Sequence, residues 1–108
     1  MEVAAGLIKL NPDSESKVHE WRDAMKSRID EALATLVHEG ATIESWFRVK
    51  IDGQDYLLWY MRAESMQTVF EVSQTFKHPI DRYHYELMSS IMAPKGNIAA
   101  KLRLDLKV

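Results

Sequence analysis

The chain has 108 residues, of which 46% are hydrophobic and 28% are charged, with four glycines and three prolines. This length and composition predict one folded domain over residues 1–108 and exclude disordered and collagen-like proteins. The chain has no cysteine, which excludes disulfides, thiolate zinc sites and a cysteine nucleophile. The formal net charge of −2 offers no broad positive surface for nucleic acid or anionic lipid.

A strand is predicted over residues 2–10, because the residues that alternate to each of its faces are apolar on both. Such a strand belongs in the middle of a sheet. No basic segment followed by an apolar run precedes it, and no apolar run in the chain is long enough to span a bilayer. We therefore expect a soluble, cytoplasmic protein without membrane contacts.

One long helix is predicted next, from the turn at residues 11–14 to Gly40. Apolar residues recur at intervals of three and four from Val18 to Leu36, which is helical spacing, and a glycine often ends a helix. Arg22 lies at the margin of this apolar stripe. Its guanidinium either reaches solvent or binds an anionic or hydroxyl-rich ligand at the mouth of a cavity.

A β-hairpin is predicted from residues 43–51 and 54–63, joined by Asp52 and Gly53. An Asp-Gly pair between two strand-like runs is a strong signal for a two-residue turn, and such a turn sets the register. The predicted facing pairs are Ile51 and Gln54, Lys50 and Asp55, Val49 and Tyr56, Phe47 and Leu58, and Trp46 and Trp59.

Two short helices, or one broken helix, are predicted after the hairpin, over residues 64–76 and from Pro79 to about residue 92. Residues 93–100 contain proline, glycine and asparagine, and we expect them to form a connection. Residues 102–108 alternate apolar and charged side chains, which predicts a last, half-exposed strand.

The element order is βαββαβ, which favours an α+β, ferredoxin-like sandwich with an antiparallel four-stranded sheet. In this fold the first and third strands are central and the other two are edges. We expect the helices to cover the sheet face that carries Tyr56 and Tyr60. The opposite face carries Trp46, Trp59 and Met61, and we expect a second copy of the chain to bury it in a homodimer. The alternative is that the hairpin twists and the tryptophans contact only neighbouring side chains and solvent.

His84 is the candidate catalytic residue, because it lies on the apolar stripe of the last helix, where a buried imidazole can act as acid or base. The alternative is a core histidine with a satisfied hydrogen bond. Arg22, Tyr60 and Tyr83 are the candidate ligand-binding residues. No metal motif, phosphate loop or nucleophile elbow occurs, so we expect neither a metal nor a cofactor.

The turn at residues 10–13, the hairpin running into residues 56–61 and the aromatic helix segment 81–85 resemble dimeric α+β barrel proteins. The chain resembles most closely a family of small, uncharacterised bacterial proteins of that superfamily and, more distantly, the L-rhamnose mutarotases. The resemblance implies a homodimer with a sugar pocket between sheet and helices. The tyrosine and histidine that the mutarotases use fall at Val18 and Arg22, and their tryptophan pair falls near Tyr83 and His84.

Three functions are consistent with the sequence. The first is a homodimer that binds a small molecule, with sugar mutarotation or cofactor-free oxygenation as the enzymatic alternatives. The second is a protein-interaction module without enzymatic activity. The third is an RNA-recognition module, which the net negative charge and the lack of a basic-glycine-aromatic signature disfavour.

Overall fold

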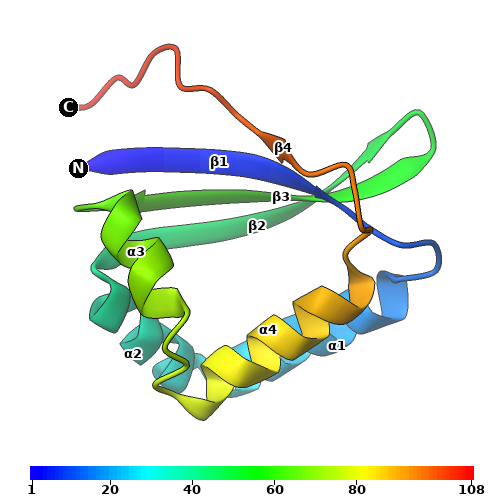
Figure 1. Cartoon of the computed structure of the whole chain (residues 1–108), viewed down its shortest axis with the longest axis horizontal. Helices are drawn as coiled ribbons and strands as arrows, with labels where there is room; N and C mark the ends of the chain where they lie inside the picture. The colour runs from blue at the N-terminus through cyan, green and yellow to red at the C-terminus, as the bar shows by residue number, and fades with distance from the viewer.

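A four-stranded antiparallel sheet is covered on one face by four helices (Figure 1). The computed structural model describes residues 1–108. Its strands are β1 (Glu2–Lys9), β2 (Ala41–Ile51), β3 (Gln54–Ala63) and β4 (Ile98–Ala99). Its helices are α1 (Glu15–Ser27), α2 (Ile29–Glu39), α3 (Met66–Ser73) and α4 (Pro79–Ile91). The strand order β2-β3-β1-β4 confirms the predicted α+β, ferredoxin-like fold with β1 and β3 in the centre.

The predicted hairpin and its register are confirmed. Asp52 and Gly53 have φ angles of 50° and 78°, and two positive φ values are what a type I′ turn requires. Trp46 lies opposite Trp59 and Ile51 lies opposite Gln54, as the turn predicts. The local turn chemistry therefore sets which side chains share a face of the sheet.

The prediction of which hairpin face meets the helices was wrong. Trp46, Trp59 and Met61 lie on the face that the helices cover, where Met61 is 8% exposed. Glu44, Arg48 and Lys50 of β2 point to the same face and remain exposed, because β2 is an edge strand of the sheet. Arg48, for example, bonds Glu15 of α1 at 3.0 Å.

The other face of the sheet, away from the helices, is called here the open face. It includes Tyr56 and Tyr60, which were expected to meet the helices. Ile43, Phe47 and Ile51 on this face are 46%, 53% and 43% exposed. An apolar surface of this kind is available for contact with another molecule.

The predicted long helix is broken into α1 and α2 at Arg28, whose φ and ψ of −116° and 38° are not helical. Its guanidinium donates two hydrogen bonds to Glu31, at 2.9 and 2.8 Å. The break turns the two halves of one apolar stripe toward different core clusters. Met25 of α1 packs against the cluster that contains Leu10, Trp21 and Leu57. Leu36 of α2 packs against the cluster that contains Ala41, Met61, Ala63 and Val69. Gly40 ends α2 with a φ of 79°, as predicted.

The predicted last strand over residues 102–108 was wrong, because β4 comprises only Ile98 and Ala99. An alternating pattern indicates two environments for the side chains, but a strand also needs a neighbour for its backbone groups. Instead the tail lies on the open side of the sheet (Figure 1), where Asp105 pairs with Arg62 at 2.6 Å. Leu104 and Leu106 are 73% and 82% exposed.

The helices at 64–76 and after Pro79 are present as α3 and α4. Pro79 occupies the first turn of α4, and Asp81 accepts a hydrogen bond of 3.0 Å from the backbone N–H of His78. The role predicted for proline at a helix start is thereby confirmed. No helix of the structure combines the length and apolar character needed to cross a membrane.

Candidate functional site

A cavity of about 580 Å³ lies between the helix-covered face of the sheet and the helices. A volume of this size is typical of pockets for small molecules. Its 22 lining residues, of which 14 are hydrophobic, come from β1, β2, β3 and all four helices. Members of both core clusters, including Trp21 and Met61, contribute to its walls.

His84 contributes to the wall of this cavity from α4. Its Nδ1 accepts a hydrogen bond of 3.0 Å from Nε1–H of Trp21, so in the neutral ring the proton is on Nε2. The ring also contacts Trp46 edge to face, with centroids 5.8 Å apart. Burial lowers the pKa of His84 below its ordinary value, although the charges of Glu44 and Asp81 act in the opposite direction. His84 is therefore a neutral imidazole with Nε2–H as its free donor.

Glu39 is the buried carboxyl group of the cavity and is 8% exposed. Its carboxyl group makes no hydrogen bond in the protein, and the residue lines the cavity. No fully enclosed side-chain oxygen of the structure lacks a partner, so the carboxyl oxygens of Glu39 retain some accessible surface. Burial raises the pKa of Glu39 to about 7, and the carboxylates of Glu44 and Asp81 add to this effect. Glu39 thus exchanges a proton near neutral pH.

Glu39 was missed by the sequence reasoning, although two signals point to it. It falls on the same helical stripe as Ala32 and Leu36, at intervals of four and three. It also lies at the carboxyl end of α2, where the helix dipole disfavours a negative charge. A carboxyl group placed on an apolar stripe at the wrong helix end indicates a role other than solubility.

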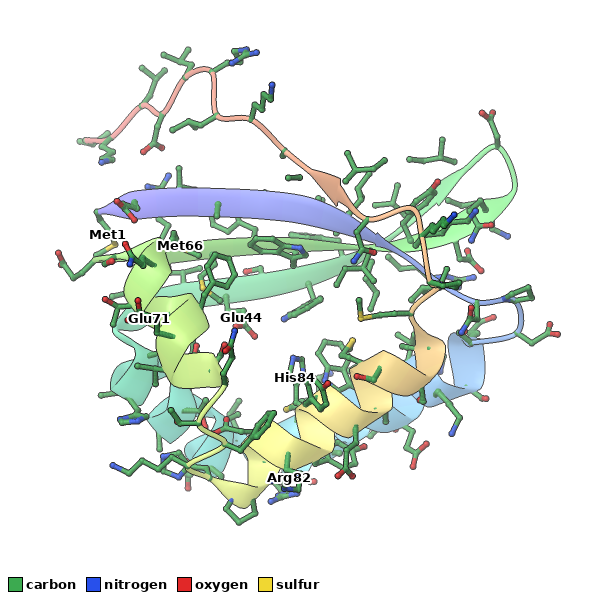
Figure 2. The ribbon with its side chains drawn as sticks, in the orientation of Figure 1. Met1, Glu44, Met66, Glu71, Arg82 and His84 are labelled. Carbon is green, nitrogen blue, oxygen red and sulfur yellow. The ribbon has the colours of Figure 1, made fainter.

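Two further carboxylates line the same part of the cavity, one from the sheet and one from α4. Glu44 of β2 accepts a hydrogen bond of 2.9 Å from Nε1–H of Trp46, and Asp81 caps the start of α4. Figure 2 shows Glu44 and His84 in the space between the sheet and the helices. We call Glu39, Glu44 and Asp81 the acidic end of the cavity. No group of three or more His, Cys, Asp or Glu side chains is arranged to hold a metal ion.

Of the predicted ligand-binding residues, only Arg22 lines the cavity. Its guanidinium is exposed and pairs with Asp23 at 3.1 Å. Tyr60 lies on the open face, where its hydroxyl accepts a hydrogen bond from Arg62. The sheet therefore separates Tyr60 from His84, contrary to the prediction. Tyr83 packs beside the core cluster of Trp21 and does not line the cavity.

The residues predicted as a dimer interface, Trp46, Trp59 and Met61, form the sheet wall of the cavity instead. Trp59 lies against the backbone of Gly6, where a Cβ would be 2.9 Å from its Nε1. Glycine at the centre of β1 therefore makes room for the indole, and β1 supplies part of the wall through Ile8.

Comparison with known proteins identifies a family and a fold. Residues 1–107 match a family described as "Family of unknown function (DUF6176)". No curated protein matches the chain. Among the matching solved structures is the L-rhamnose mutarotase of Formosa agariphila, with a TM-score of 0.62 and 18% sequence identity. That alignment covers 99% of this chain and 100% of the mutarotase chain, and at this identity it shows a shared fold.

Proposed function

The chain belongs to the family of unknown function DUF6176, and from its own geometry we propose that it binds a small organic molecule in the cavity beside His84. The single observation that carries the proposal is that two polar groups in the largely apolar cavity have no hydrogen-bond partner in the protein. These groups are Nε2–H of His84 and the carboxyl group of Glu39. Apolar walls with a few convergent polar groups are typical of ligand pockets.

The two groups have complementary chemistry. Glu39, with a pKa of about 7, takes a proton from a bound molecule or returns one to it. Nε2–H of neutral His84 donates a hydrogen bond to an oxygen or nitrogen on which negative charge develops. The acid–base role expected for His84 thereby passes to Glu39, because burial and the Trp21 bond favour the neutral imidazole.

Sugar mutarotation is the second candidate function, favoured by the fold shared with L-rhamnose mutarotase and by a group that exchanges protons near pH 7. Ring opening of an aldose requires removal of the anomeric hydroxyl proton and protonation of the ring oxygen. The positions of the mutarotase tyrosine and histidine hold Val18 and Arg22 here, so Glu39 and His84 would have to perform this reaction. Exchange between sugar anomers, followed by NMR, tests it directly.

The binding proposal is tested by thermal unfolding against a panel of neutral sugars, small acids and small amines. We expect at least one class to raise the Tm of the wild-type protein, and expect Ala32→Leu, which fills the cavity wall, to abolish the shift. His84→Gln is expected to weaken binding, whereas His38→Gln on the exposed side of α2 is the matched control. Absence of a shift with every class would favour the interaction module without enzymatic activity.

We also propose that the protein is a homodimer in which two copies pack open face to open face. The exposed Ile43, Phe47 and Ile51 support this, since a second copy is a natural cover for an apolar sheet face. The resemblance to dimeric α+β barrels implies the same assembly. The cavity lies on the opposite side of the sheet, so each copy keeps its own ligand site.

A further inference from the structure

We propose that the ligand of this cavity is a small cationic amine, whose nitrogen binds at the acidic end of the cavity. This inference rests on the proposed function and adds the chemical class of the molecule bound. The apolar body of the amine packs against the tryptophans of the sheet wall, Trp46 and Trp59. Three features of the cavity support an amine: a buried carboxyl group without a protein partner, the charges around it and the aromatic wall.

The first observation is the isolation of Glu39. The Glu39 side chain makes no hydrogen bond to the protein although the residue is only 8% exposed, so its carboxyl group has lost much of its contact with water without gaining a protein donor. Carboxyl groups with little exposure ordinarily have a hydrogen-bond donor in the protein. Glu31, at the other end of α2, accepts such a bond from Arg28 at 2.8 Å. An ammonium group from a ligand supplies three donors and one positive charge to this position.

The second observation is the sign of the charges that face Glu39. Glu44 comes from β2, and Asp81 comes from α4 together with the neutral His84. The only cationic side chains of the cavity wall are Arg22 and Lys26 of α1. Both are exposed, and Arg22 is paired with Asp23. The acidic end therefore has no protein cation of its own, and it repels an anionic ligand.

The third observation is the aromatic wall. Trp46 and Trp59 line the cavity, and a cation near the face of an indole is attracted by the ring. Trp46 also donates its Nε1–H to Glu44, which places an aromatic ring directly beside one of the three carboxylates. Aromatic rings beside carboxylates are a suitable combination for an alkylammonium group and its hydrocarbon body.

The inference is tested by calorimetric titration at pH 8 with three ligands that share one apolar body: 2-phenylethylamine, 2-phenylethanol and phenylacetate. We expect the amine to bind about tenfold more tightly than the alcohol, because it adds a charged hydrogen bond, and expect phenylacetate to bind most weakly. Glu39→Gln is expected to weaken amine binding and to remove most of the preference for the amine over the alcohol. Glu64→Gln, an exposed matched control, is expected to change neither.

A second readout is proton release. At pH 7 a bound ammonium displaces the proton of Glu39, so the heat of amine binding is expected to depend on the ionisation enthalpy of the buffer, and this dependence is lost in Glu39→Gln. Alcohol binding as tight as amine binding, no amine binding, or an unchanged preference in Glu39→Gln would overturn the inference. The proposed function itself fails only when the sugars, acids and amines all leave the Tm unchanged.

Discussion

The indole Nε1–H of Trp21 donates a 3.0 Å hydrogen bond to Nδ1 of His84, and this bond joins α1 to α4 across 63 residues of sequence. It determines which ring nitrogen carries the proton and directs Nε2–H away from the core. The same two rings lie with centroids 5.9 Å apart, so the imidazole is held by packing as well as by the bond. The orientation of the free donor in the cavity depends on this contact.

Trp21→Phe is expected to leave the buried Nδ1 of His84 without a donor and to lower the free energy of unfolding by about 1–3 kcal/mol. The neutral imidazole then populates both tautomers, which ¹⁵N NMR of labelled histidine detects. The control is Trp46→Phe, which removes a bond to the exposed Glu44 and retains the Trp21 bond. A single unchanged tautomer in Trp21→Phe would contradict the role given to this hydrogen bond.

Glu39→Gln is expected to make stability less dependent on pH between about 4.5 and 7. The pKa of Glu39 is raised from 4.5 to about 7 in the folded protein, so the folded state binds this proton more tightly than the unfolded state does. Wild-type stability therefore falls as pH rises through this window, and the glutamine variant lacks that contribution.

The measurement is the Tm of wild type and Glu39→Gln at pH 5 and pH 8. We expect the variant to gain about 4 °C or more relative to wild type on going to pH 8, which corresponds to about 1 kcal/mol for a domain of this size. Glu64→Gln serves as the exposed control. Parallel Tm profiles for wild type and Glu39→Gln would show that Glu39 titrates normally.

Gly6→Ala is expected to destabilise the fold by about 1–3 kcal/mol through overpacking. Its Cβ would lie 2.9 Å from Nε1 of Trp59 and 3.0 Å from the backbone oxygen of Ile98, so both the cavity wall and β4 have to move. Urea unfolding measures the loss. Trp59→Leu is expected to restore part of it in a double-mutant cycle, and strictly additive effects would exclude the steric contact with the indole.

Phe47→Asp is expected to weaken the proposed homodimer by about 30-fold, since a central aromatic residue of an interface is typically worth about 2 kcal/mol. Sedimentation velocity at micromolar concentration measures the effect. Val37→Asp is the control, because Val37 is an apolar residue that is 78% exposed on α2, away from the open face. A monomeric wild-type protein, or a dimer that persists in Phe47→Asp, would disprove open-face pairing.

Local chemistry made much of the fold predictable. Asp52 and Gly53 adopt the two positive φ values that their types favour, and a two-residue turn allows one register for the hairpin. Gly40 and Pro79 mark helix ends because one adopts a left-handed conformation readily and the other lacks an N–H. These features depend on residues close together in sequence.

The tertiary structure alone decided which face of the hairpin the helices cover, because both faces carry large apolar side chains. The alternation of side chains along a strand assigns residues to two faces but does not say which of the two is buried. It also decided the break at Arg28, which an uninterrupted apolar stripe conceals, and the unpaired tail after β4. The cavity is likewise a feature that only the tertiary structure decides, because Glu39, Glu44 and His84 come from α2, β2 and α4. The shifted pKa values of Glu39 and His84, and the proximity of all three groups, arise from packing between distant segments, which no short stretch of sequence contains.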